Sequence, residues 1–370
     1  MKNILFLIHD LGGGGAEKVL VNLVNHMDRK KWNITVMVLF GGGVNESALR
    51  KDVRLICCHE KAFRGNSHVM KLFSPRFLYR HYIREHYDVA VSFLEGPCAR
   101  ILSGCDDPQT RTVAWIHGTL ADKKTFSVGF RGFAEAVRCY SKFKERIFVS
   151  KDTRKAFEAL CPGSGQVLYN VLDTEHIVHQ AQVPLADPWF QRPGIYLCAM
   201  GKLTANKGFD RLLRIHRRLR EDGFCLFTCI LGEGQERAAL QIYIDQEGLQ
   251  DSVRLLGYRE NPYPYLQKCH LFVCASHSEG YSTAAAEALI LGVPVCAVGV
   301  SGMTELLGAN TEYGVVTENS EEALYQSIRR LLEDPALLAR YREQAALRGK
   351  VFSTEKAVGA VEQLLEEVAP

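Results

Sequence analysis

The chain has 370 residues, of which 47% are hydrophobic and 24% are charged, and its formal net charge is +3. These values are typical of a globular protein and exclude a disordered or fibrous chain. The length exceeds that of a typical domain and predicts two domains. Because the net charge is low and no recognition module is visible, nucleic acid is not an expected partner.

The charge is unevenly divided between the two halves of the sequence. Residues 1–180 contain 26 Lys and Arg against 18 Asp and Glu, whereas residues 181–370 contain 19 against 24. A basic first half predicts contact with something anionic, such as a phospholipid surface or a lipid-pyrophosphate acceptor. The alternative is a chance scatter of surface charge.

Cysteine usage and hydropathy indicate where the protein works. The twelve cysteines lie mostly in apolar runs, and none has the Cys-x2-Cys spacing of a zinc site or redox motif. We therefore expect reduced cysteines, no disulfide and a cytoplasmic location. The first predicted strand begins at residue 3, which leaves no room for a signal sequence, and no apolar run reaches the ~18 residues that span a bilayer. Any membrane contact is expected to be peripheral, at the inner face of the membrane.

The chain opens with the pattern of a Rossmann-like unit. A strand is predicted over 3–8, a loop with four glycines over 9–15 and a helix over 16–27. The loop is not a dinucleotide fingerprint, because Glu17 stands where the third glycine would be, and no Gly-Lys-Ser/Thr of a Walker loop occurs. Glycines here allow close approach to a diphosphate and aim N–H groups at it. A flexible turn without a ligand is the alternative.

Four more strands are predicted in the first half, and a histidine directly follows the last of them. They cover 34–40, 53–58, 88–94 and 112–116. His117 comes next, at the carboxyl end of a strand, where open α/β sheets bind ligands. The loop over 119–130 is expected to line an acceptor site. A lone histidine is more often structural, so only its position supports His117 as a site residue.

A basic and aromatic segment, 61–84, lies between two of these strands. Its basic residues are Lys61, Arg64, Lys71, Arg76, Arg80 and Arg84, interleaved with Phe63, Phe73, Phe77 and Tyr79. The pattern resembles an interfacial amphipathic helix and predicts peripheral membrane contact through the basic first domain. A solvated helix that packs its apolar face on the core is the alternative, and the more common one.

The second half repeats the strand, loop, helix order after a predicted linker over 172–193. A strand over 195–200 is followed by a loop that contains Lys202 and Lys207, and then by a helix over 209–220. Lysine is a flexible point charge that suits phosphate oxygens. Two surface lysines on a loop are the alternative.

A polar turn over 276–283 separates a predicted strand, 270–275, from a predicted helix, 284–291. Its N–H groups would meet the positive end of the helix dipole, an arrangement that suits a phosphate. Glu279 precedes the helix and Glu287 lies within it, about 12 Å further on if the whole span were helical. That separation exceeds the roughly 5–9.5 Å of a hydrolase pair, so it favours two roles on one extended ligand. Two solvated glutamates are the alternative.

The spacing Glu-x7-Glu, followed by Gly-Val-Pro-Val at 292–295, resembles the donor-site motif of the retaining GT-B glycosyltransferases of family 4. Gly-Gly-Ala-Glu at 14–17 and the lysine loop are similar to the same family. The resemblance implies an α/β GT-B fold, with two Rossmann-like parallel-sheet domains facing across a cleft. It implies an acceptor domain over 1–175, a donor domain over 190–348 and a helix over 349–370 that returns to the first domain.

The resemblance also implies the roles of individual residues. The residues implied in catalysis are His117, Glu279 and Lys207, with His117 and Glu279 contacting the transferred sugar. Those implied in donor binding are Gly14, Gly15, Lys202, Lys207, Arg259, Gly280, Tyr281, Ser282, Thr283 and Glu287, with Glu287 on the ribose. The family usually carries arginine where this sequence has Lys202, which keeps the charge but loses the bidentate fork.

The activity implied is retaining transfer of a sugar from a nucleotide diphosphate, with UDP the expected carrier, to a hydroxyl of a glycan or lipid-linked acceptor. No Asp-x-Asp occurs in the sequence, so the usual ligands for a diphosphate-bound cation are missing. We therefore expect neither a metal nor another cofactor, and expect lysines and backbone amides to neutralise the leaving diphosphate.

Two other functions remain open from the sequence. A nucleotide-sugar epimerase of GT-B shape would need acid and base residues around the sugar, and no such cluster is visible beside His117 and Glu279. A non-catalytic partner of another transferase would be favoured by loss of Glu279 or of a lysine, and neither is lost. A nicotinamide dehydrogenase is disfavoured by the missing third glycine.

Overall fold

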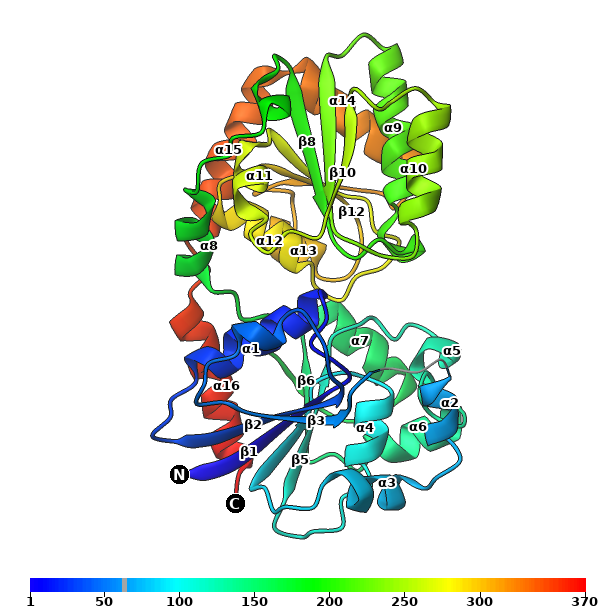
Figure 1. Cartoon of the computed structure of the whole chain (residues 1–370), viewed down its shortest axis with the longest axis vertical. Helices are drawn as coiled ribbons and strands as arrows, with labels where there is room; N and C mark the ends of the chain where they lie inside the picture. The colour runs from blue at the N-terminus through cyan, green and yellow to red at the C-terminus, as the bar shows by residue number, and fades with distance from the viewer. Residues whose placement is uncertain (62–64) are drawn as a thin grey trace. The chain divides into compact units, whose positions relative to one another are not determined.

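The computed structural model, which describes residues 1–61 and 65–370, divides into two compact units (Figure 1). Unit 1 comprises Met1–Val171 and Thr354–Pro370, and unit 2 comprises Leu172–Ser353. Each is built on its own parallel sheet. Two Rossmann-like parallel-sheet domains are therefore confirmed.

The sheet of unit 1 has seven strands in the order β3-β2-β1-β4-β5-β6-β7. The strands are β1 (Lys2–Ile8), β2 (Trp32–Phe40), β3 (Arg54–His59), β4 (Val89–Ser92), β5 (Arg111–Ile116), β6 (Glu145–Phe148) and β7 (Gln166–Val167). The chain runs outward in one direction from β1 to β3, then returns to the other side of β1 with β4. Loops after β1 and β4 therefore leave the sheet where its strand order reverses, which is the usual ligand position in such sheets.

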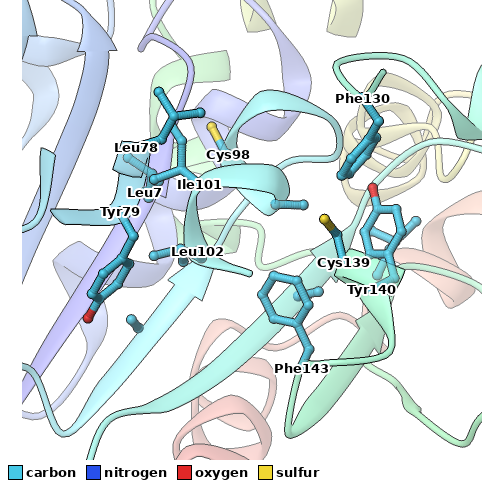
Figure 2. Close-up of a cluster of buried hydrophobic side chains, with 14 of the residues drawn as sticks. Leu7, Leu78, Tyr79, Cys98, Ile101, Leu102, Phe130, Cys139, Tyr140 and Phe143 are labelled. Carbon is cyan, nitrogen blue, oxygen red and sulfur yellow. The ribbon is translucent and has the colours of Figure 1, made fainter. Parts of the chain in front are cut away.

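Helices cover the sheet of unit 1. They are α1 (Gly15–His26), α2 (Asn66–Met70), α3 (Pro75–Tyr82), α4 (Pro97–Leu102), α5 (Lys123–Phe126), α6 (Phe133–Tyr140), α7 (Lys151–Leu160) and α16 (Thr354–Val368). Buried side chains of α3, α4 and α6 meet inward-facing residues of the strands in one core (Figure 2). Leu78, Ile101 and Tyr140 belong to it, with Leu7 of β1. Apolar residues at helical spacing thus bury the α3, α4 and α6 faces against the sheet.

The segment predicted as one amphipathic helix, 61–84, is two short helices, α2 and α3. A turn at 71–74 separates them, because Ser74 caps α3 by accepting from the N–H of Phe77 and Pro75 occupies the first helical position. Leu78 and Tyr79 are buried while Leu72 is 75% exposed. Phe63 and Arg64 lie outside the described residues.

The sheet of unit 2 has six strands in the order β10-β9-β8-β11-β12-β13. They are β8 (Ile195–Met200), β9 (Leu226–Leu231), β10 (Val253–Gly257), β11 (Leu271–Cys274), β12 (Val295–Val298) and β13 (Val315–Thr317). The order reverses between β8 and β11, which pair directly. The lysine loop follows β8 and the polar turn follows β11, so both leave the sheet at this reversal.

The helices of unit 2 pack on both faces of its sheet. They are α8 (Thr174–Ala181), α9 (Phe209–Glu221), α10 (Arg237–Gln246), α11 (Tyr263–Lys268), α12 (Thr283–Ile290), α13 (Met303–Leu307), α14 (Glu321–Glu333) and α15 (Pro335–Gly349). Apolar residues of α9, α10 and α14 share one core with the strands. Short 3-10 turns lie at Pro188–Gln191 and Ala205–Lys207 in unit 2, and at Glu46–Ala48 in unit 1.

The segment predicted as a linker, 172–193, is instead folded into unit 2. It forms α8, which contacts α11 and α12, and the turn Pro188–Gln191, whose Trp189 and Phe190 are buried. Enough apolar surface is buried to order the segment, although its sequence is largely polar. The final helix, α16, belongs to unit 1, where it contacts α1 and where Glu362 accepts from the N–H of Asp28.

None of the helices in the described part of the chain is both long enough and apolar enough to cross a membrane.

Candidate functional site

Two loops of unit 2 meet where its strand order reverses. The N–H of His277 donates to the carbonyl of Asn206 at 2.7 Å, and the Asn206 side chain donates to the carbonyl of Ser278 at 2.8 Å. Gly208 makes this approach possible, since a Cβ there would lie 2.1 Å from the carbonyl oxygen of Ala275. The lysine loop, 201–208, and the polar turn, 276–283, with Ala275 before it, therefore form one platform.

Lys207 and Glu279 pair across this platform. The Lys207 Nζ lies 2.5 Å from the Glu279 Oε1, and the Ser276 hydroxyl donates to the same oxygen at 2.6 Å. Their side chains are 26% and 10% exposed, so both remain accessible to a ligand while water is partly excluded. The structure thus brings together two predicted catalytic residues that lie 72 positions apart in the sequence.

The first turn of α12 stands next to Glu279 in the chain. Ser282 is its N-cap, and the Ser282 hydroxyl accepts from the N–H of Ala285 at 3.3 Å. Gly280 and Tyr281 are buried, and Thr283 is the first helical residue. The cap uses the Ser282 hydroxyl, so the anion-binding capacity of this turn comes from its N–H groups and the helix dipole.

Glu287 lies inside α12 and is 3% exposed. The hydroxyl of the buried Tyr263 donates to the Glu287 Oε1 at 3.2 Å. Burial, and then the neighbouring Glu287 charge, raise the pKa of Tyr263 far above its ordinary value, which keeps the hydroxyl protonated as a donor. No local pattern predicts this contact, because Tyr263 opens a separate helix, α11, with no motif around it.

Two predicted donor-binding residues lie on the surface of unit 2. Lys202 follows β8 and is exposed. The Arg259 guanidinium lies over the ring of Tyr265, 5.7 Å from its centroid. Neither side chain has the buried, contact-rich setting of Lys207 and Glu279.

The glycine loop of unit 1 leads into α1, with Gly14 as N-cap and Gly15 as the first helical residue. Acidic side chains flank it. A Cβ on Gly14 would lie 2.2 Å from a Glu17 carboxylate oxygen, and the Asp10 carboxylate accepts from the N–H of Gly12 at 2.8 Å. Any diphosphate held here would depend on backbone N–H groups.

His117 follows β5 in unit 1 and packs on the ring of Phe93, with centroids 4.6 Å apart. Burial lowers its pKa to about 3, so the imidazole is neutral at physiological pH. The Nε2 atom is buried and has no hydrogen-bond partner among the described residues. The Glu95 carboxylate accepts from the N–H groups of His117 and Gly118, which fixes the backbone beside the ring. Glu95, in the loop after β4, was not predicted as a site residue.

Three cysteines form a buried cluster in unit 2. Cys198 and Cys229 are register partners on β8 and β9, Cys269 ends α11, and the three Sγ atoms lie within 4.8 Å of one another. No sequence spacing indicated this group. It offers three ligand atoms, one fewer than the four of a structural zinc site, and it is the one group of this kind in the described ranges 1–61 and 65–370.

Two family profiles match most of the chain. "Glycosyl transferases group 1" matches residues 190–348, and "Glycosyltransferase Family 4" matches residues 13–176. The chain is a group 1 glycosyltransferase. The Lys207–Glu279 pair and α12 of this glycosyltransferase lie within the group 1 match.

Curated relatives of the glycosyltransferase are also transferases. The N-acetylgalactosamine-N,N'-diacetylbacillosaminyl-diphospho-undecaprenol 4-alpha-N-acetylgalactosaminyltransferase of Campylobacter jejuni is 27% identical, over 96% of this chain and 97% of its own. The lipopolysaccharide core biosynthesis glycosyltransferase LpsD of Rhizobium meliloti is 28% identical, over 47% of this chain and 50% of its own.

Solved structures resemble the glycosyltransferase along its whole length. Anabaena HepE in complex with UDP and glucose has a TM-score of 0.79 at 18% identity, covering 99% of this chain and 100% of HepE. WaaG, a glycosyltransferase involved in lipopolysaccharide biosynthesis, has a TM-score of 0.74 at 17% identity, covering 98% and 99%. These likenesses confirm the fold class, the pair of Rossmann-like units of GT-B glycosyltransferases.

Proposed function

We propose that this glycosyltransferase retains the anomeric configuration while it moves a sugar from a UDP carrier to a hydroxyl of a glycan or lipid-linked acceptor, without a metal ion. The Lys207–Glu279 pair carries the proposal. An ammonium group beside the N-terminus of α12 suits a diphosphate, and a carboxylate suits sugar hydroxyls. Both lie where parallel sheets bind ligands.

The identity of the carrier is supported by the solved relative HepE, which holds UDP and glucose. With the donor bound, the buried Glu287 would accept hydrogen bonds from the ribose hydroxyls, and Glu279 would accept them from hydroxyls of the transferred sugar. Tyr263 already donates to the Oε1 of Glu287 at 3.2 Å, which helps to orient the carboxylate. Because one carboxylate can accept several hydrogen bonds, the two partners are compatible.

The reaction proceeds by exchange of one bond at the anomeric carbon. The bond from that carbon to the UDP oxygen breaks, and a bond to the acceptor oxygen forms on the same face of the sugar. The acceptor proton passes to a phosphate oxygen of the donor, so no side chain is needed as base. Lys207, Lys202 and the N–H groups of the polar turn stabilise the charge that develops on UDP.

Metal independence is supported by the lack of an Asp-x-Asp motif and by the cationic group already placed at the platform. A lysine and oriented amides supply the stabilisation that a divalent ion supplies elsewhere.

A lipid-linked acceptor is supported by the name of the Campylobacter relative, which specifies a diphospho-undecaprenol substrate. An enzyme that uses such acceptors would work in the cytoplasm at the inner face of the membrane. In unit 1 the exposed apolar side chains Val69, Leu72, Phe73 and Phe77, here called the apolar knuckle, would meet the bilayer.

Two arginines donate hydrogen bonds to the backbone of the apolar knuckle. The buried Arg100 donates to the carbonyls of Met70 and Phe73 and pairs with Glu135, and Arg131 donates to the carbonyls of residues 71–73. Phe73 and Phe77 stack with centroids 4.9 Å apart. Exposed aromatic and aliphatic groups beside arginines are the composition of an interfacial contact.

The proposal is tested by incubating the purified enzyme with UDP-sugars and an undecaprenyl-diphosphate-linked sugar. We expect a product heavier by one sugar, with the donor's anomeric configuration by NMR, formed equally in EDTA. Inverted product or loss of transfer in EDTA would overturn the retaining or the metal-independent part. Donor incubated alone tests for an epimer, the product of the rival activity.

A further inference from the structure

A buried arginine lies against the polar turn. Arg211, in the first turn of α9, is 3% exposed. Its guanidinium donates to the carbonyl of Ala275 at 2.5 Å, to the carbonyl of Ser276 at 2.9 Å and to the side chain of Asn319 at 2.9 Å. Asn319 in turn donates to the carbonyl of His277 at 3.0 Å. Three consecutive carbonyl groups where the polar turn begins, those of residues 275–277, are therefore held from one side.

The charge of Arg211 is not neutralised by direct pairing with an acid in the described part of the chain. Every partner of its guanidinium is a carbonyl or amide oxygen. The neighbouring Asp210 and Glu321 pair with Arg214 instead, at 3.1 and 2.8 Å. Since arginine stays protonated in proteins, a full positive charge remains under the turn. Burial of this charge costs free energy unless hydrogen bonds in a fixed geometry, or an anionic ligand, replace the hydration that is lost.

We propose that Arg211 is a positioning residue for donor binding: it fixes the polar turn through its carbonyl groups, and its charge strengthens the hold on a nucleotide diphosphate. The inference rests on the proposed function for its ligand. Ser276, whose carbonyl Arg211 binds, donates its hydroxyl to Glu279, so the geometry at Arg211 is passed to the Lys207–Glu279 pair. The sequence motifs end at Gly208 and do not include Arg211.

Substitution of Arg211 by methionine and by lysine separates geometry from charge. Arg211→Met keeps the length of the side chain but removes both effects, whereas Arg211→Lys keeps the charge and loses the fork. Arg214→Met is the matched control, because it is the same change on the same helix at an arginine that already has acidic partners.

The positioning role is read without any ligand, by hydrogen–deuterium exchange over residues 275–283. We expect faster exchange of this segment in both Arg211 variants and no change in Arg214→Met. Unchanged exchange in a folded Arg211→Met protein would overturn the positioning role. Rates elsewhere in unit 2 show whether the variant is folded.

The role of charge is read by calorimetric titration with UDP and with uridine. We expect Arg211→Met to lower the affinity for UDP by about tenfold or more and to change the affinity for uridine little. The affinity of Arg211→Lys for UDP should lie between those of Arg211→Met and the wild type. Equal losses for UDP and uridine would overturn the charge role. If the wild-type protein itself binds no UDP, GDP or ADP, the proposed function fails, and the exchange experiment still decides the positioning role.

Discussion

The Lys207 ammonium and the Glu279 carboxylate lie 2.5 Å apart, so before a donor arrives each neutralises the other. A diphosphate would compete with Glu279 for Lys207, and the carboxylate released would then be available to sugar hydroxyls. The ion pair therefore holds both groups in place, and ligand binding would exchange partners while each group keeps a hydrogen-bond partner.

Lys207→Ala is expected to lower turnover by orders of magnitude, because the charge that develops on the leaving diphosphate loses its nearest cation. The measurement is the rate of UDP release at saturating donor. Lys268→Ala, at an exposed lysine of α11 in the same unit, is the control and should keep the wild-type rate. Near-normal transfer by Lys207→Ala would refute the role given to Lys207.

Tyr263→Phe is expected to raise the KM for the donor several-fold and to leave kcat nearly unchanged, because Glu287 is then held less firmly against the ribose. Loss of the buried hydrogen bond should also lower the free energy of unfolding by about 1 kcal/mol. Steady-state kinetics and urea unfolding test these effects. Tyr265→Phe, a partly buried neighbour on α11, is the control, and a drop in kcat alone would contradict the assignment.

Leu72→Asp is expected to reduce sedimentation of the protein with anionic phospholipid vesicles by about tenfold, because it places a charge at the most exposed position of the apolar knuckle. Val44→Asp is the control, since Val44 is also exposed in unit 1 but lies outside the apolar knuckle. Transfer to a soluble acceptor should be equal in both variants. Unaltered vesicle binding by Leu72→Asp would remove the knuckle from the proposal.

Acid should destabilise unit 2 through His216. The ring is fully buried between Thr228 and Ser252, and burial lowers its pKa to about 3. The unfolded chain binds the proton near pH 6.5, so the folded form loses stability as the pH falls from there toward 3, by up to about 1.4 kcal/mol per pH unit. His216→Gln should flatten this dependence in urea unfolding at pH 5 and pH 7.5. An unchanged slope would show that other groups control it.

Much of this architecture could be predicted from the periodicity of apolar residues and from the residues that end helices and strands. The strand–loop–helix order at the start of each half of the chain, and the helix that begins after the polar turn, follow from apolar runs bounded by glycine and proline. Two rules failed locally. Residues 172–193 have linker composition but fold into unit 2, and residues 61–84 break into two helices at the capping serine, Ser74.

The two Rossmann-like units and the loops that carry Lys207 and Glu279 could be predicted without coordinates, because hydrophobic periodicity and turn chemistry depend on neighbouring residues. The distant groups that support the predicted site residues became visible only in the folded chain: Arg211 under the polar turn, Tyr263 on Glu287 and Glu95 beside His117. Parallel sheets bring the carboxyl ends of separate strands to one edge, and contacts made there join residues that no local pattern connects.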